Sequence, residues 1–286
     1  MREITRQAPA KLNLTLDILG RRPDGYHDLR MVMQAISLCD TVTVRETAGE
    51  DVTVSLNRGD LPAGRDNIAW KAAEVFFRST GLPRRGLAIT LKKVIPAQAG
   101  MAGGSADGGA VLKILRELYA PALPQQALEE MGAAVGSDVP FCIRGGTALA
   151  EGRGEVLTSL PPLPDCWIAL CKPDFGLSTP ALFGRVQAET LRDRPDHAAM
   201  ERALAAGDLE AAARQMKNVF EEVLTPEEAR EIDGIRRQLL LHGALNAVMT
   251  GSGPTVFGLF REREAAGQAA EALRRCYSQV FTAKPI

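Results

Sequence analysis

A run of glycines and small residues in the middle of the chain has the composition of a phosphate-binding turn. It reads Pro96, Ala97, Gln98, Ala99, Gly100, Met101, Ala102, Gly103, Gly104, Ser105, Ala106 and Asp107. Glycine permits positive φ and lets a ligand approach the backbone closely, and successive amide N–H groups at a helix start bind anions. Ser105 supplies a hydroxyl for a phosphate or its metal ion. The run is not a Walker A loop, because no Lys-Ser or Lys-Thr pair follows it, and it lacks the G-x-G-x-x-G spacing.

The flanking elements place this run between a strand and a helix. Residues 86–95 alternate as a strand does, and Val111, Leu112, Leu115 and Leu118 recur at helical spacing. Gly108 and Gly109 continue into the first turns of the helix, where each costs about 1 kcal/mol relative to Ala. We therefore expect something to lie close to that helix face. A tight turn without a ligand is the alternative interpretation.

A second group of candidate functional residues lies on a strand near the start of the chain, residues 10–18, where apolar and polar residues alternate. Lys11 and Asn13 share one face of that strand, about 7 Å apart. The motifs that flank this strand favour a functional role for the pair. The alternative is the solvent-exposed polar face of an edge strand.

An aromatic ring and an imidazole follow the next turn. Pro23, Asp24 and Gly25 are typical turn residues. Tyr26 could stack on a planar base, and His27 could hydrogen-bond the edge of that base. A half-buried tyrosine beside a surface histidine is the alternative.

A single carboxylate stands out between the two halves of the chain. Asp138 precedes Val139 and Pro140 and is followed by apolar residues. It is either an N-cap or turn former, or a site residue in a partly dry cleft. The local sequence leaves both possibilities open.

The remaining pattern predicts two α+β domains, residues 1–160 and 161–286, because prolines cluster at 161–164 without periodicity. Residues 40–46 and 52–56 are predicted to form a hairpin, and Asp66 or Asn67 to cap a helix that runs through Phe77. Strands are expected at 167–171, 244–250, 255–260 and 279–284, with helices between them on one face of a small sheet.

Composition excludes several classes of function. The net charge of −1 argues against broad electrostatic binding to nucleic acid. No run of eighteen apolar residues predicts a membrane span, and the first residues lack a signal-peptide core. Five cysteines without a C-x-x-C pair indicate reduced thiols in a cytoplasmic protein. The three histidines are too few and too scattered to form the ligand set of a zinc site, which argues against one.

The motifs occur in an order that resembles a kinase superfamily named after galactokinase, homoserine kinase, mevalonate kinase and phosphomevalonate kinase. Within it, the chain is similar to the diphosphocytidyl-methylerythritol kinase family. The motifs that carry the resemblance are Pro-Ala-Lys-Leu-Asn-Leu at 9–14, Asp-Gly-Tyr-His at 24–27, the glycine run, Gly-Ser-Asp-Val-Pro-Phe at 136–141 and Gly-Ser-Gly-Pro at 251–254.

The resemblance implies a ribosomal-protein-like N-terminal domain, a ferredoxin-like C-terminal domain and an active site in the cleft between them. It implies transfer of the γ-phosphoryl of ATP, with Mg²⁺, to the tertiary 2-hydroxyl of a cytidine-diphosphate conjugate of methylerythritol. Asp138 would be the base and Lys11 its cationic partner, and residues 96–106 would hold ATP, with Ser105 at the metal. Substrate contacts would come from Asn13, Tyr26, His27, Phe183, Gly251 and Ser252.

The resemblance also implies a monomer or weak homodimer that acts on a small molecule, with no nucleic acid or membrane as partner. Another kinase of the same superfamily, of the homoserine or mevalonate type, is the first alternative. A non-catalytic RNA-binding module is the second, and the near-zero net charge and 5% aromatic content count against it.

Overall fold

The computed structural model describes the whole chain, residues 1–286, as two compact units. The first unit comprises Met1–Ala10, Cys39–Ile95 and Ala102–Gly145, and the second comprises Lys11–Leu38, Pro96–Met101 and Gly146–Ile286. The two long strands β1 (Glu3–Arg21) and β2 (His27–Thr47) contribute residues to both. These units interleave along the chain, so they do not follow a single break at residue 160. As a division into family domains, that boundary stays a prediction.

The strands of the first unit are paired in an order that the sequence did not reveal. Strand β4 (Gly86–Lys92) lies between β3 (Val52–Leu56), to which it is parallel, and the C-terminal part of β2, to which it is antiparallel. The predicted hairpin of residues 40–46 with residues 52–56 is therefore wrong. The alternation of residue types identifies both strands. Their pairing depends on β4, which lies thirty residues later in the chain and has a fully apolar, buried inward face (Leu87, Ile89 and Leu91).

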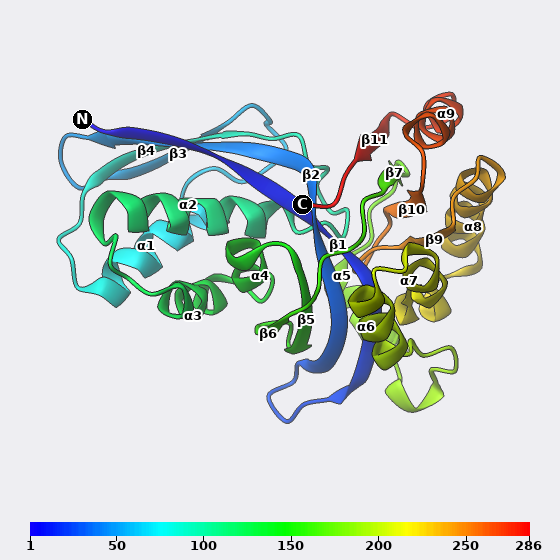
Figure 1. Cartoon of the computed structure of the whole chain (residues 1–286). Coiled ribbons are helices and arrows are strands. Elements are labelled where there is room, and N and C mark those ends of the chain that lie inside the picture. Colours follow the sequence, from blue (N-terminus) through cyan, green and yellow to red (C-terminus); the bar gives the residue numbers. More distant parts are fainter. The chain divides into compact units, whose positions relative to one another are not determined.

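Helices cover this sheet portion in the first unit (Figure 1). Asn67 caps α1 (Ile68–Thr80) by accepting a hydrogen bond from the amide of Ala69, which confirms the predicted start. Helix α2 (Gly103–Tyr119) follows the glycine run as expected, and its middle is almost entirely buried. Helices α3 (Gln125–Val135) and α4 (Val139–Arg144) complete the unit, together with the short η1 turn (Gly64–Asp66).

Gly108 and Gly109 are explained by helix packing. A Cβ atom at Gly108 would lie 2.7 Å from Cγ2 of Ile68 on α1, and one at Gly109 would lie 3.2 Å from the carbonyl carbon of Cys142 on α4. Something does lie close to this helix face, as the sequence suggested, but it is neighbouring protein. The two glycines let α1 and α4 pack closely against α2. They face protein atoms and do not mark a ligand site.

The second unit contains a four-stranded antiparallel sheet of order β11-β7-β10-β9. Its strands are β7 (Trp167–Lys172), β9 (Asn246–Met249), β10 (Val256–Phe260) and β11 (Gln279–Ala283). Helices α8 (Pro226–Leu241) and α9 (Arg263–Arg274) lie together on one face of it (Figure 1). Thr225 and Glu228 form a capping box at the start of α8. This arrangement confirms the predicted α+β module.

Shorter elements link β1 and β2 to this sheet within the second unit. They are β5 (Thr147–Gly152), β6 (Val156–Ser159), α5 (Thr179–Arg185), η2 (Ala188–Thr190), α6 (His197–Ala206), α7 (Leu209–Gln215), β8 (Lys217–Asn218) and η3 (Val219–Val223). Strand β8 pairs in parallel with β1, with Leu16 opposite Asn218. Strand β5 pairs with β2. No helix is both long and apolar enough to cross a membrane.

The helix packing of the first unit gives a stability prediction. Gly108→Ala should lower the free energy of unfolding by about 1–3 kcal/mol, because the added methyl group overpacks the contact with Ile68. Gly267→Ala in α9 is the matched control, since nothing lies within 4 Å of its Cβ position. That change should stabilise the chain by up to about 1 kcal/mol. Urea unfolding of both variants tests this, and equal effects would contradict it.

Candidate functional site

A stripe of four polar side chains on β1 is buried in the second unit. Lys11, Asn13, Thr15 and Asp17 are each at most 4% exposed. The interpretation of this face as a solvated edge is therefore wrong. Buried polar groups need partners. The Lys11 ammonium donates to the Asn13 side-chain oxygen at 2.6 Å.

The lower half of this stripe draws its partners from the chain around residues 194–197. The Thr15 hydroxyl lies 3.1 Å from Nδ1 of His197 and accepts the amide of Val32 at 3.0 Å. Burial lowers the pKa of His197 to about 4, and the nearby Arg30 charge acts in the same direction, so the ring is neutral at pH 7. The Asp17 carboxylate accepts from the Arg194 guanidinium at 2.7 Å.

The upper half of the stripe is bound to a glycine turn at residues 250–253. The amide of Asn13 donates to the Thr250 hydroxyl at 2.9 Å, and Thr250 is fully buried. On the same strand, the amide of Lys11 donates to the carbonyl of Met101 at 3.2 Å. Strand β1 thus binds both the segment Pro96–Met101 and the turn at residue 250, through the backbone amides of Lys11 and Asn13.

The segment Pro96–Met101 and this turn touch backbone to backbone. A Cβ atom at Gly100 would lie 2.1 Å from the carbonyl oxygen of Thr250, and one at Gly251 would lie 2.6 Å from the carbonyl oxygen of Gly100. Both glycines have positive φ, +72° and +56° respectively. Only glycine fits either position. Ser252, the next residue of the turn, shares a hydrogen bond with Thr179 at 2.7 Å between their hydroxyl oxygens.

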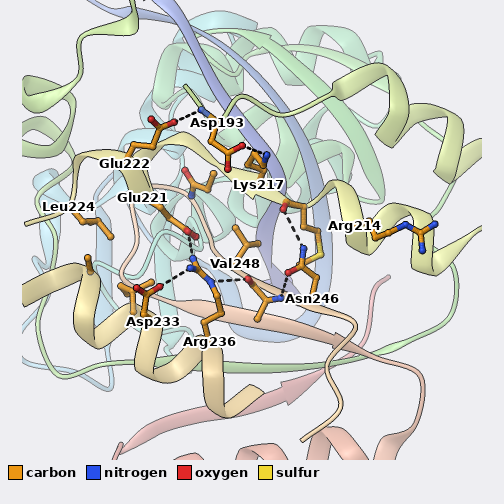
Figure 2. Close-up of a pocket in the computed structure, with 15 residues that line it drawn as sticks. Asp193, Arg214, Lys217, Glu221, Glu222, Leu224, Asp233, Arg236, Asn246 and Val248 are labelled. Carbon is orange, nitrogen blue, oxygen red and sulfur yellow. Dashed lines mark hydrogen bonds and ion pairs between the residues drawn. The ribbon is translucent and has the colours of Figure 1, made fainter. Parts of the chain in front are cut away.

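A pocket of about 510 Å³ with charged lining residues adjoins the turn (Figure 2). Two of its lining residues, Asn218 and Glu221, bind the backbone at residues 249–251. Asn218 donates to the carbonyls of Met249 and Gly251 at 2.7 and 2.8 Å. The Glu221 carboxylate accepts the amide of Met249 at 2.7 Å and pairs with Arg236. Burial raises the pKa of Glu221, and Arg236 opposes that rise. No motif marks Asn218 or Glu221 in the sequence, and only their hydrogen bonds to the backbone of the turn reveal what they do.

Aromatic residues gather at another place in the second unit. The His27 and Phe183 rings stack with centroids 4.7 Å apart and planes 23° from parallel, and Phe183 meets Phe220 edge-on at 4.9 Å. Partial burial, with help from Arg21, lowers the pKa of His27. Tyr26 is 58% exposed and lies under the Arg153 guanidinium at 5.2 Å. The structure therefore brings His27 and Phe183 together and leaves the Tyr26 ring accessible on one face.

The second half of the glycine run belongs to the first unit. Ala102 precedes α2 with φ of +56°, and Gly103, Gly104 and Ser105 form its first turn. The first amides of a helix have no partner within the helix, so this turn is a favourable place for a phosphate. Gly104 is exposed and Ser105 half-buried. The remaining residues of the run, Pro96 to Met101, lie in the second unit.

Asp138 occupies the N-cap position of α4 in the first unit and is half-buried, and the five residues after it are apolar and buried. Its side chain makes no capping hydrogen bond to that helix. The side chain therefore does not cap this helix, and the remaining roles, as a turn former or as a site residue, both stay predictions. Lys11 belongs to the second unit, and the partnership of the two stays a prediction.

The fold and these motifs define a class. The model described as the GHMP kinases N terminal domain matches residues 67–146, and the model of the GHMP kinases C terminal region matches residues 200–279. The chain is thus a two-domain kinase of the GHMP type. The arrangement of the domain models along the chain also confirms the predicted kinase fold.

Similar proteins of known name indicate which family within this class the chain belongs to. The chain is 39% identical to the 4-diphosphocytidyl-2-C-methyl-D-erythritol kinase of Clostridium tetani, covering 98% of this chain and 99% of that protein. It is 43% identical to the kinase of the same name from Pelotomaculum thermopropionicum, with 98% and 97% covered. A crystal structure of 4-(cytidine 5'-diphospho)-2C-methyl-D-erythritol kinase matches with a TM-score of 0.83 and 32% identity over 99% of each chain. The chain belongs to the 4-diphosphocytidyl-2-C-methyl-D-erythritol kinase family.

The contact between Gly100 and the turn gives a second prediction. Gly100→Ala should destabilise the chain and weaken ATP binding by tenfold or more, because its methyl group collides with a backbone carbonyl that cannot rotate away. Gly207→Ala is the control: Gly207 has a similar φ of +65° but nothing within 4 Å. Isothermal titration with ATP measures the difference. Equal affinity in the two variants would show that the contact does not shape the nucleotide site.

Proposed function

We propose that this chain transfers the γ-phosphoryl of ATP to the 2-hydroxyl of 4-diphosphocytidyl-2-C-methyl-D-erythritol, in the non-mevalonate route to isoprenoid precursors. The observation that carries the proposal is similarity over nearly the full length, at 39% and 43% identity, to kinases named for that substrate. The site geometry within each unit supports it.

Asp138 is assigned the role of general base. A tertiary hydroxyl is weakly acidic, so its proton must leave as its oxygen bonds to the γ-phosphorus and the bond from that phosphorus to the bridging oxygen of ADP breaks. A half-buried carboxylate next to the buried apolar start of α4 is suited to accept that proton. Lys11, held against Asn13 in a dry environment, is assigned to offset the negative charge of the transition state.

The glycine run is assigned to the triphosphate of ATP. Phosphoryl transfer depends chiefly on alignment and charge neutralisation, and the first turn of α2 offers unpaired amides for both. Mg²⁺ fits this place, because it is usually held by few protein oxygens together with substrate phosphates. Ser105 would provide such an oxygen. The ion would neutralise charge on the phosphates.

The aromatic group is assigned to the cytosine. His27, stacked on Phe183 and neutral at pH 7, offers ring nitrogens to the edge of a base. The exposed ring of Tyr26 offers a stacking surface. Asn13, Gly251 and Ser252 are assigned to the remaining substrate contacts. A homoserine- or mevalonate-type substrate has no nucleobase, so neither ring would have a base to stack on or to hydrogen-bond.

We further place this activity in the cytoplasm, in a monomer or weak homodimer that needs neither nucleic acid nor membrane. The near-zero net charge and the absence of a membrane-spanning helix support that placement.

Substrate preference tests the function directly. With ATP and Mg²⁺, the purified chain should turn over the cytidine conjugate with a kcat/KM at least 10³-fold above that for mevalonate or homoserine, since a site built for hydrogen bonds discriminates strongly. Coupled detection of ADP measures all three. Faster turnover of mevalonate or homoserine would replace the proposal with the alternative kinase.

The assigned base gives a further prediction. Asp138→Asn should reduce kcat by roughly 10²–10⁴-fold, because the amide cannot accept the proton, while the Kd for ATP changes little. Asp208→Asn is the matched control, because Asp208 also precedes a helix but caps it, accepting from the amide of Ala211 at 2.9 Å. That control should keep full turnover. Normal turnover in Asp138→Asn would remove this carboxylate from the chemistry.

A further inference from the structure

A buried cluster of three charged side chains lies in the first unit, and of its members only Asp107 belongs to a motif discussed so far, the glycine run. The Lys93 ammonium pairs with the carboxylates of Asp40 and Asp107. The three side chains are 4%, 0% and 4% exposed, respectively. They come from the end of β4, from β2 and from the second turn of α2. One cation thus joins three elements in a dry environment.

The cluster binds the backbone immediately before the glycine run and at Gly103 within it. Asp40 Oδ1 accepts the amide of Ile95 at 2.8 Å and also that of Val94. At the start of α2, Lys93 donates to the carbonyl of Gly103 at 3.2 Å. A Cβ atom at Gly103 would lie only 3.0 Å from Cγ2 of Ile95. Both ends of the span from Ile95 to Gly103 are therefore held by directional bonds.

Two carboxylates share this single ammonium, so the charge of the cluster is not balanced. Burial raises the pKa of Asp107 to about 7; Lys93 opposes the rise and the Asp40 charge adds to it. Asp107 Oδ1 has no hydrogen-bond partner. Arg58 acts on Asp40 from a distance, and the thiol of Cys39 adjoins it in the chain. A proton on Asp107 neutralises the excess charge at the start of α2.

Apolar side chains of the same volume would hold these elements at no greater cost, since buried ion pairs seldom stabilise more than well-packed hydrophobic groups. Apolar contacts, however, do not fix the direction of an amide, whereas hydrogen bonds do. We propose that Asp40, Lys93 and Asp107 are positioning residues that fix the span from Ile95 to Gly103 and so orient the first amides of α2 toward the phosphates of ATP. The inference rests on the proposed assignment of this turn to ATP.

Lys93→Met in the full chain tests the positioning role. Its Kd for ATP should rise about tenfold or more, the loss expected when a hydrogen bond to a charged phosphate is misplaced, and its melting temperature should fall. Glu46→Gln is the matched control. Glu46 accepts the hydroxyl of Tyr119 at 3.0 Å and the amide of Arg2 at 2.8 Å, so it anchors the opposite end of the same seventeen-residue helix. This control should lower the melting temperature and leave the Kd unchanged.

Asp107→Asn is a second test, because the substitution hardly changes the size of the side chain. It tests the positioning role even if Lys93→Met does not fold. In the native chain the proton on Asp107 is lost as pH rises through about 7, which places a negative charge near the phosphates. ATP affinity should therefore fall between pH 6.5 and 8 by more in the native chain than in Asp107→Asn, which stays neutral. Between about pH 4 and 7 the unfolding free energy should likewise fall by more in the native chain than in Asp107→Asn, because only the native chain carries the raised pKa of Asp107.

The outcomes separate the two proposals. If the native chain binds no ATP, the assignment of this turn to ATP fails, and the positioning role fails with it. If the native chain binds ATP but Lys93→Met and Asp107→Asn leave both the Kd and its pH dependence unchanged, only the positioning role is overturned. A raised Kd in Glu46→Gln equal to that in Lys93→Met would also overturn it, because any loosening of α2 would then suffice.

Discussion

The burial of a polar stripe on β1 is the constraint on which the second unit depends. Four polar side chains in alternation, each at most 4% exposed, cannot remain without partners in a dry interior. The side chains of Asn13, Thr15 and Asp17 find partners in Thr250, His197 and Arg194, which follow them by 177 to 237 residues. One strand thereby determines where three later segments must lie. The same strand also binds the carbonyl of Met101, so the first half of the glycine run is fixed from the same side.

Glycine serves two different purposes along this chain. At Gly100 and Gly251, positive φ and backbone contact combine, and no other residue fits. At Gly108 and Gly109 the backbone is helical, and the missing side chain makes room for Ile68 and Cys142. The phosphate contacts proposed for the run would therefore come from the backbone of its last residues, where α2 begins. The other glycines bring protein segments together within their own units.

The charged groups show a similar division. Glu221 and Arg236, in the pocket behind the turn, satisfy each other and the amide of Met249. In the first unit, Asp40 and Lys93 bind backbone groups at Ile95, immediately before the glycine run, and at Gly103 within it. In both places buried charge orders a nearby loop. Such networks direct hydrogen bonds to chosen backbone groups, which hydrophobic packing cannot do.

The sequence by itself determined the local elements and the family. The cap at Asn67, the helix after the glycine run and the strands of the small sheet follow from spacing and residue type, and the ordered motifs indicated the kinase family. Only the tertiary structure decided that β4 separates β2 from β3, that the polar face of β1 is buried, and that Asp40, Lys93 and Asp107 meet. The physical reason is range: helix periodicity and capping act over a few residues, whereas strand pairing and burial depend on segments that the chain supplies much later.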